Sequence, residues 1–296
     1  MKHKPHLDQR PFLVRPGRRF RLKDHAPDAT GEFGGKAAAK QALGEDVGAL
    51  AAAQELLWAD AGRSVIVILQ ALDAAGKDGT IKHVMSGVNP QGVEVVSFKA
   101  PSEEEKRHHF LWRPTRALPG RGRIAIFNRS YYEEVLVVRV HPEWLAGQYI
   151  PAELRKHGYR RLWKVRFDRI NEFERTLVEN GVCVIKFFLN VSKKEQKARF
   201  LERLNNPEKH WKFSAADIRE RQHWKDYQHA YEEMLAATST KEAPWYVIPA
   251  DHKWFARAVV ADIIAERIER MKLKFPRPTQ EQLDGLDAAR AQLESE

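Results

Sequence analysis

The stretch from Ser64 to Thr80, SVIVILQALDAAGKDGT, constrains the fold more than any other part of the sequence. It begins with an apolar, β-branched run typical of a buried strand, passes through a turn that contains glycine and lysine, and ends where a helical pattern resumes. Backbone N–H groups at such a helix N-terminus face an anion, and the lysine adds a full positive charge. The stretch therefore predicts a phosphate-binding loop, with an ordinary tight turn between strand and helix as the alternative.

The loop departs at two positions from the pattern G-x-x-x-x-G-K-[ST] of the Walker A motif. Ala71 stands where the first glycine would be, and Asp78 replaces the residue whose hydroxyl binds Mg²⁺ in that motif. A carboxylate, Asp73, lies inside the loop instead. The sequence therefore predicts an anion cradle around Lys77, with carboxylates in place of the missing hydroxyl as metal ligands.

Short apolar segments alternate with helical patterns along most of the chain, as expected for strands of a parallel sheet that helices cover on both faces. In such a doubly wound sheet the active site lies at the carboxyl ends of the strands. We therefore predict an α/β protein with a P-loop kinase-like, three-layer α/β/α fold and a five-stranded parallel sheet. The expected strands cover residues 65–72, 93–98, 123–128, 182–189 and 245–249, and the expected helices cover residues 46–60, 80–85, 102–113, 131–139, 159–180, 192–204, 214–237 and 254–272.

The sequence divides into an arm, one domain and a tail. Residues 1–45 are rich in Lys, Arg, Pro, Gly and Ala and predict an extended basic arm. Residues 46–275 carry the alternating pattern and predict a single domain. Within it, residues 192–240 contain two charged helices joined by a loop, which we interpret as a mobile helical lid. Residues 276–296 predict a polar C-terminal tail.

The composition limits the partners and the compartment. Lys and Arg exceed Asp and Glu by 10 (50 against 40), so a polyanionic partner fits the charge, whether nucleic acid, acidic lipid headgroups or a phosphate polymer. No run of about eighteen apolar residues is present, so we expect no membrane span. The single cysteine, Cys183, cannot form an intrachain disulfide and favours a reducing cytoplasm.

A second group of candidate residues follows the third expected strand. That strand ends at Asn128, where a Walker-B-type carboxylate would be expected, and Arg129 comes next. Because the carboxyl ends of parallel strands meet at one edge of the sheet, we expect Arg129 to face whatever the loop holds. Glu133 and Glu134 lie in the first turn of the following helix. They are either favourable charges at a helix N-terminus or ligands that share a Mg²⁺ ion with Asp73.

Several separate motifs, taken in order, resemble the polyphosphate kinase 2 family. The resemblance covers roughly residues 45–272. The motifs that carry it are LDAAGKDGTI at 72–81, MSGVNPQG at 85–92, NRSYYE at 128–133, and WKFS followed by DIRER within 211–221.

The tracts MSGVNPQGV and NRSYYEE are most similar to the subfamily that phosphorylates both AMP and ADP (class III). The subfamily that mainly interconverts ADP and ATP tends to carry Asp-Arg-Ser-Trp-Tyr-Asn, and this sequence differs from it at Asn128, Tyr131 and Glu133. The resemblance therefore implies AMP, ADP and ATP as nucleotide partners and inorganic polyphosphate as the phosphoryl donor. It also implies a homo-oligomer (dimer or tetramer), with neither nucleic acid nor a membrane as partner.

What the resemblance implies is a reversible, in-line transfer of a terminal phosphoryl group without a covalent intermediate. Lys77 would hold the transferred group, and Arg129 would neutralise its equatorial oxygens. Asp73 would hold Mg²⁺, or Mn²⁺ in its place, or would orient the accepting phosphate. Glu133 and Glu134 would support the metal.

Further residues are expected to bind the two substrates, although a solvated helix face is the alternative for those in the lid. The candidates for phosphate and polyphosphate are Ala74, Ala75, Gly76, Lys77, Asp78, Gly79, Thr80, Lys82, Arg129, Lys209 and Lys212, and those for the nucleotide are Asn128, Arg129, Arg113, Arg116, Arg199 and Arg203.

Two other functions fit parts of the sequence. An ATP-dependent nucleoside-monophosphate kinase of similar fold is one, but Ala71 and Asp78 argue against it. A basic nucleic-acid-binding module without catalysis is the other, but the carboxylates Asp73, Glu133 and Glu134 would repel a polyanion unless a metal lay between them. Formation of ADP and ATP from polyphosphate without added ATP separates the three hypotheses.

Overall fold

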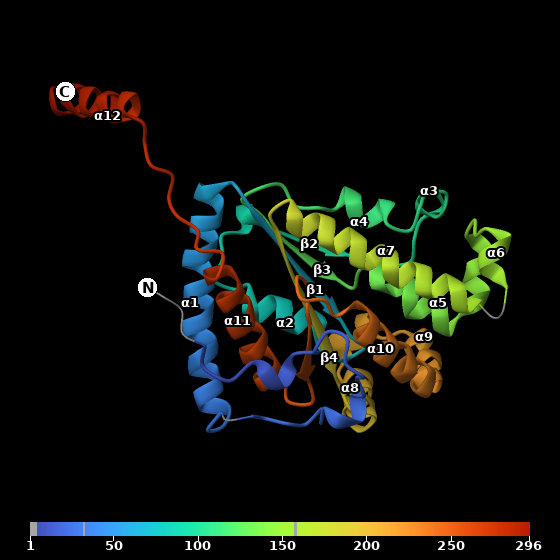
Figure 1. Ribbon diagram of the computed structural model, residues 1–296. Helices are drawn as coiled ribbons and strands as arrows, with labels where there is room; N and C mark the ends of the chain where they lie inside the picture. The colour runs from blue at the N-terminus through green and yellow to red at the C-terminus, as the bar shows by residue number, and fades with distance from the viewer. Residues whose placement is uncertain (1–4, 32, 157–158) are drawn as a thin grey trace.

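The computed structural model describes residues 5–31, 33–156 and 159–296. At its centre lies a sheet of five parallel strands in the order β2-β3-β1-β4-β5 (Figure 1). The predicted five-stranded parallel sheet is confirmed, and the strand ends lie within two residues of the expected limits. The strands are β1 Ser64–Gln70, β2 Val93–Ser97, β3 Ile124–Asn128, β4 Val182–Asn190 and β5 Trp245–Pro249.

Helices cover both faces of the sheet and give the fold its three layers (Figure 1). On one face lie α1 Lys36–Asp60, α2 Lys77–Val84 and α11 Lys253–Glu269. On the other face lie α7 Arg160–Glu179 and α10 Trp224–Thr238. The long helices on both faces explain why the strands read as continuous apolar runs rather than as an alternating pattern.

The central strand β1 illustrates this burial. All seven of its residues are buried. Ile66 and Ile68 belong to the core on the side of α7 and α10, whereas Val65, Val67 and Leu69 belong to the core on the side of α1 and α11. Because β1 has β3 on one side and β4 on the other, the loop that follows it emerges in the middle of the sheet edge.

Three helices that the sequence predicts as continuous are broken in the structure. Residues 102–113 form a short helix and the start of a second one, since Pro114 has no N–H to donate to the carbonyl of Phe110. Residues 131–139 open as a 3-10 helix, and residues 214–237 are interrupted by a 3-10 turn. The shorter elements are η1 Arg10–Phe12, η2 Leu22–Asp24, η3 Pro90–Gly92, α3 Glu103–Lys106, α4 Trp112–Arg116, η4 Tyr131–Val135, α5 Val137–Val140, η5 Pro142–Gly147, α6 Ala152–Arg155, α8 Lys193–Asn205, η7 Pro207–Lys212, α9 Ala215–Glu220, η8 Arg221–His223 and α12 Gln280–Glu294.

The N-terminal arm is shorter than predicted. α1 begins at Lys36, so the last ten residues of the segment expected to be extended, 36–45, are helical. The run of Lys and Ala from Lys36 onward consists of strong helix formers, which the low periodicity of the segment concealed. Residues 1–4 and 32 of the predicted arm lie outside the described residues.

Within the rest of the arm, Leu13 and Val14 lie along the free edge of β5. Leu13 forms an antiparallel bridge with Tyr246, and the N–H of Val14 donates to the carbonyl of Trp245 at 2.9 Å. Phe12 is buried, and its ring packs edge-on against Phe255 with the ring centroids 6.1 Å apart. A covered edge strand has fewer unpaired backbone groups, so the arm is part of the folded domain rather than a solvated appendage.

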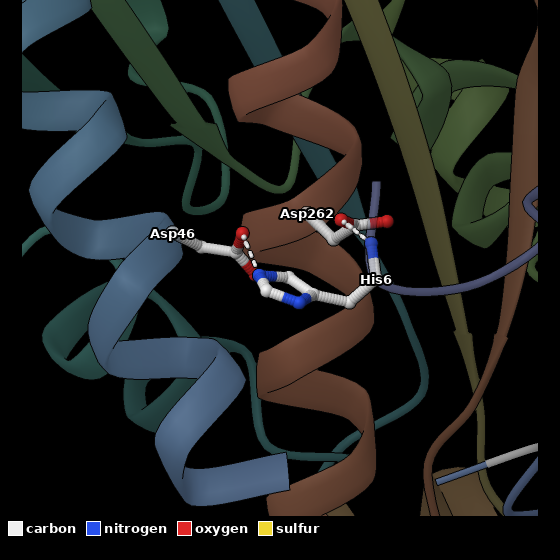
Figure 2. Close-up of side chains that lie close together, drawn as sticks. All are labelled: His6, Asp46 and Asp262. Atoms are coloured by element: carbon white, nitrogen blue, oxygen red, sulfur yellow. Dashed lines mark hydrogen bonds and ion pairs between the residues drawn. The ribbon is translucent and has the colours of Figure 1, made fainter. Parts of the chain in front are cut away.

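A cluster of His6, Asp46 and Asp262 joins the arm to two helices (Figure 2). His6 Nε2 lies 3.2 Å from Asp46 Oδ1 of α1, and the backbone N–H of His6 donates to Asp262 Oδ1 of α11 at 2.8 Å. Asp46 is fully buried. Burial, and after it the nearby Asp262 and Glu45, raise the pKa of Asp46 to about 8. The folded protein therefore holds the proton of this carboxyl more tightly than the unfolded chain does.

Asp46→Asn is expected to flatten the loss of stability with rising pH. Because the folded-state pKa of Asp46 lies above its ordinary value, this group contributes stability that is complete at low pH and is lost as the pH rises through about 8. Thermal melts at about pH 6 and about pH 9 measure the effect: the wild-type Tm should drop further than that of the variant. Glu55→Gln is the control, because Glu55 is an exposed carboxylate of the same helix and is not among the groups that raise the pKa of Asp46. Equal drops in wild type and Asp46→Asn would contradict the interpretation.

Beyond α11 the chain leaves the domain. α12 stands away from the body at the end of an extended segment (Figure 1), and all of its residues are exposed. It opens with a capping box between Thr279 and Gln282, and it lies in the segment expected to be a polar tail. Within the described residues, no helix combines the length and the apolar character that crossing a bilayer requires.

Candidate active site

The loop between β1 and α2 lies where the sequence predicts the phosphate cradle. Gly76 occupies the N-cap of α2 with φ of +113°, a conformation that favours glycine because it has no Cβ. Residues 73–80 all line one cavity of about 1170 Å³. The predicted loop candidates Ala74, Ala75, Gly76, Lys77, Asp78, Gly79 and Thr80 are therefore all brought to a single space.

Lys77 is the cation at the base of this cavity. Its side chain is largely buried, and Nζ donates to the carbonyl of Ala71 at 2.9 Å and to that of Leu72 at 3.4 Å. Burial, and after it the nearby Arg129, lower the pKa of Lys77 to about 8, against the opposing effect of Asp73. The first residues of the loop thus hold the ammonium in place. Its lowered pKa means that it loses its charge in the mildly alkaline range.

Arg129 joins the two neighbouring strand ends. Its N–H donates to the carbonyl of Leu69 at 3.0 Å, and its φ of +64° is unusual for a residue other than glycine. Nη2 lies 2.5 Å from Asp73 Oδ1, and Nη1 lies 3.2 Å from Glu133 Oε2. Glu133, and after it Asp73, raise the pKa of this guanidinium against the effect of burial. Two predicted catalytic side chains, Asp73 and Arg129, are therefore in contact, and the third, Lys77, lines the same cavity.

The predicted metal ligands do not all converge. Glu133 lies beside Asp73 and also accepts from Gln70 Nε2 at 2.8 Å. Glu134 instead accepts from Gln148 Nε2 at 2.9 Å and pairs with Arg166 Nη1 at 3.2 Å, away from Asp73. Adjacent residues of a 3-10 helix point in different directions, which explains why only one of the two glutamates reaches the loop.

A small cavity of about 30 Å³ lies beside the loop, and its lining can be compared with the ligands that a divalent metal requires. The carboxylates of Asp73, Glu133, Asp217 and Glu220 line it. Burial, and after it the charge of Asp73, raise the pKa of Asp217 across this space. Mg²⁺ prefers oxygen ligands and is commonly held by one or two carboxylates together with substrate phosphates and water. Asp73 and Glu133 fit that requirement, and Asp217 is a carboxylate that the sequence analysis did not include.

Arg199, a predicted nucleotide-binding residue, lines the large cavity but turns its guanidinium toward the backbone. It is buried, and its guanidinium donates to four backbone carbonyls: Nη1 to Ala74 and Ala75 at 3.0 and 2.6 Å, and Nη2 to Ala250 and Asp251 at 2.5 and 3.0 Å. With these donors in use, Arg199 ties the loop to the segment after β5. The arrangement indicates that Arg199 positions the loop, and its predicted contact with the nucleotide stays a prediction.

The connection from α8 to α9, which belongs to the predicted lid, lies beside the loop, whereas α10 at the end of that predicted lid packs against the sheet. Lys212 Nζ is 3.5 Å from Asp78 Oδ2, and Asn128 Nδ2 donates to Asp78 Oδ1 at 2.9 Å. Arg203 Nη1 is 3.6 Å from Asp217 Oδ2. Lys209, Arg203, Lys212 and Asn128 all line the large cavity, as predicted for substrate-binding residues.

Three basic residues of the large cavity were not predicted: Lys99, Lys253 and Arg257. Lys253 and Arg257 lie one turn apart at the start of α11, and Arg257 Nη1 is 3.0 Å from His83 Nε2. Their position after the fifth strand of a parallel sheet is the signal that could have found them, because helix starts at that edge face the site. Of the other predicted residues, Lys82 is exposed on α2 and outside the lining of this cavity.

A second cavity, of about 520 Å³, adjoins the first. Both are lined by Phe98, Lys99, Ala100 and Arg129. The second cavity is more apolar, with Phe110, Pro114 and Trp144 in its wall, and it includes Arg113 from the predicted set. Arg116 lies outside the lining of both cavities, with its guanidinium 4.8 Å from the ring centroid of Trp112. Arg129 thus lies in the wall that the large cavity shares with the smaller, more apolar one.

The strand order and the lysine-bearing loop after the central strand define a P-loop kinase-like α/β protein. Comparison with known proteins narrows this class. The family model described as "Polyphosphate kinase 2 (PPK2)" matches residues 35–276. The chain belongs to the polyphosphate kinase 2 family, as its motifs predict.

Individual relatives agree with this membership. The ADP-polyphosphate phosphotransferase of Rhodopseudomonas palustris is 53% identical over 226 residues, which cover 76% of this chain and 78% of that protein. The AMP/ADP-polyphosphate phosphotransferase of Meiothermus ruber is 46% identical over 268 residues, which cover 90% of this chain and 95% of that protein. The crystal structure of polyphosphate kinase 2 from Arthrobacter aurescens TC1 matches with a TM-score of 0.85 and 39% identity over 96% of this chain and 95% of that one.

The titration of Lys77 predicts an alkaline limit to activity. Because its pKa is lowered to about 8, the cation that faces the anion is lost as the pH rises through that value, and kcat/KM should fall above it. Lys77→Arg retains charge at all these pH values. Its residual activity should therefore lack the alkaline limb, as a pH–rate profile would reveal. Parallel declines in wild type and Lys77→Arg would show that another group titrates.

Proposed function

We propose that this protein transfers the terminal phosphoryl group of inorganic polyphosphate to AMP and ADP, giving ADP and ATP, in a reversible reaction. The observation that carries the proposal is the large cavity, in which Lys77, Arg129 and Lys212 face one continuous space. A polymer with regularly repeated negative charges suits a large cavity lined by many basic residues, by the same electrostatic logic as nucleic-acid binding.

The names of the relatives support the choice of acceptors. Both relatives described above are named as polyphosphate phosphotransferases, one for ADP and the other for AMP and ADP. The match to the AMP/ADP enzyme covers the larger share of this chain. The tracts 85–92 and 128–134 also resemble the subfamily that uses both acceptors. We therefore propose that AMP is a substrate as well as ADP.

The proposed chemistry is positioning and charge stabilisation rather than covalent catalysis. Lys77 moves from its carbonyl partners to the transferred phosphoryl group, and Arg129 stabilises the negative charge on the equatorial oxygens of that group. Asp73 and Glu133 hold the guanidinium of Arg129 in place from two sides. Arg199 holds the loop in shape by donating hydrogen bonds to the carbonyls of Ala74 and Ala75.

A divalent metal would be held by Asp73 and Glu133 together with phosphate oxygens, and we propose Mg²⁺, with Mn²⁺ as a substitute. Asp217 lines the same small cavity and is the further candidate ligand. When bound, such an ion neutralises phosphate charge. Glu134 is left out of the proposed ligand set because it pairs with Arg166 and Gln148.

The second cavity suits the acceptor nucleotide. Its wall combines aromatic and apolar side chains with Arg113, whose guanidinium lies 5.0 Å from the ring centroid of Phe98. A purine ring and a phosphate need those two kinds of surface. Because the two cavities share Arg129, a donor in the larger one and an acceptor in the smaller one would meet at that residue.

We further propose that the protein acts in the cytoplasm as a homo-oligomer and does not require nucleic acid. Size-exclusion chromatography with light scattering tests the oligomeric state. A competition assay with duplex DNA tests the last statement, because DNA should inhibit only as a weak polyanion that loses affinity with salt.

The direct test mixes the protein with AMP or ADP, Mg²⁺ and polyphosphate, with no ATP, and follows new ADP and ATP. Lys77→Ala and Asp73→Ala should each reduce turnover by at least about a hundredfold, because they remove groups that contact the transferred phosphoryl group or its metal. Glu134→Gln is the matched control and should lose less than about threefold, because an amide can still bond to Arg166. No product from either acceptor at any polyphosphate length would exclude the proposed reaction.

The walls of the large cavity should determine the affinity for polyphosphate. Lys212→Ala and Arg257→Ala are each expected to raise KM for polyphosphate by about fivefold, since a charge-assisted hydrogen bond is worth about 1 kcal/mol or more. Steady-state kinetics at fixed ADP measure this change, and KM for ADP should stay constant. Lys197→Ala removes an exposed lysine of α8 outside that cavity and is the control. A fivefold change in all three variants would indicate a general charge effect only.

A further inference from the structure

A buried polar network lies beneath the segment that carries Arg129 and Glu133. Tyr131 and Tyr132 both donate their hydroxyls to the same oxygen of Glu174, Oε1, each at 2.7 Å. Lys186 Nζ lies 2.5 Å from the other oxygen, Oε2. These four side chains come from η4, α7 and β4, and all four are at least nine-tenths buried.

The network is fully satisfied. Lys186 Nζ uses its three donors on Glu174 Oε2, on the hydroxyl of Tyr132 at 2.9 Å and on the carbonyl of Thr238 at 2.8 Å. Thr238 ends α10, and its hydroxyl accepts from Trp245 Nε1 at 2.9 Å. A buried polar network of this kind rigidifies the elements it joins only when each member has partners, which is the case here.

Stability alone is a weak reason for such a network. Well-packed apolar side chains of similar volume are often as stable as a buried ion pair, or more stable. The place of the network is more informative, because Tyr131 and Tyr132 lie between Arg129 and Glu133 in the chain. The 3-10 turn aims both hydroxyls at one carboxylate oxygen, so the turn cannot rotate without breaking two buried hydrogen bonds.

The backbone at Arg129 needs such support. Its φ of +64° lies in the left-handed region, and strained residues persist only where the surroundings hold them. On the side of β1, Gln70 donates to Glu133 and accepts from the hydroxyl of Ser130 at 3.2 Å. On the side of α7, Glu174 accepts from the hydroxyls of Tyr131 and Tyr132. The segment is thus fixed on both sides.

We propose that Glu174 and Lys186 are positioning residues for phosphoryl transfer, which act through Tyr131 and Tyr132 to fix the guanidinium of Arg129. The proposal rests on the role of Arg129 in the proposed function. A displacement of a catalytic group by about 1 Å can cost about a hundredfold in rate, so loosening this turn should affect turnover rather than substrate binding.

The test is a double-mutant cycle. Glu174→Leu/Lys186→Met removes both charges together, which avoids leaving one buried charge unpaired. It should lower kcat by about tenfold or more and change KM for ADP and for polyphosphate by less than about twofold. In the Arg129→Ala background the same pair of changes should lower the residual kcat by less than about twofold, because the group being positioned is absent.

A second variant serves if the first does not fold. Tyr131→Phe/Tyr132→Phe keeps the ion pair and removes only the two hydroxyls, and it should lower kcat by at least about threefold with the same non-additivity. Ser239→Ala, which removes a buried hydroxyl that donates to the carbonyl of Val14, is the control for lost buried hydrogen bonds. It should lower Tm without lowering kcat.

The outcomes distinguish the positioning role of Glu174 and Lys186 from the proposed phosphoryl-transfer reaction. Equal losses of kcat in the wild-type and Arg129→Ala backgrounds, or no loss in either, would overturn the positioning role and leave the proposed function standing. Full activity of Arg129→Ala itself would overturn the positioning role and the assigned role of Arg129, whereas the reaction itself would be overturned only by the absence of product from polyphosphate. A loss confined to chains that contain Arg129 supports the proposal.

Discussion

The pairing of Arg129 with Asp73 and Glu133 is the contact on which the site depends. It links the loop after β1 to the turn after β3 and spans two neighbouring strand ends. Two carboxylates beside a mostly buried guanidinium are electrostatically acceptable only because each balances part of its charge. The spacing of β1 and β3 in the sheet therefore sets the distance between the loop that carries Asp73 and the turn that carries Arg129 and Glu133.

Around this centre the protein replaces parts of the familiar phosphate loop. In the proposed metal site, the carboxylates of Asp73 and Glu133, with Asp217 as a further candidate, take the place of the hydroxyl that is missing at Asp78. The loop also lacks its first glycine, and Arg199 holds its carbonyls from outside. Both replacements use charged side chains for tasks that backbone and hydroxyl groups perform in the Walker A motif.

The sequence predicted the sheet, the loop and the placement of Lys77, Asp73 and Arg129 around one cavity, because these depend on periodicity and on the rule that parallel strand ends share an edge. It could not distinguish Glu133 from Glu134, since their separation depends on the 3-10 form of the turn. It also could not tell that Arg199 points at carbonyls rather than at a ligand. A basic residue on a charged helix looks the same in both cases, and only tertiary packing decides.

The ion pairs made by the basic residues of the large cavity carry a consequence for how a polyanion is held. Lys212 already pairs with Asp78, Arg203 with Asp217, and Lys209 with Glu202. A phosphate chain that enters the large cavity therefore exchanges partners with carboxylates instead of meeting bare positive charge. The net free energy of each contact is the difference between two attractions, so it is smaller than the charge count suggests. A polymer bound by such exchanges can advance by one unit at low cost, because each cation has a carboxylate to return to while the chain shifts.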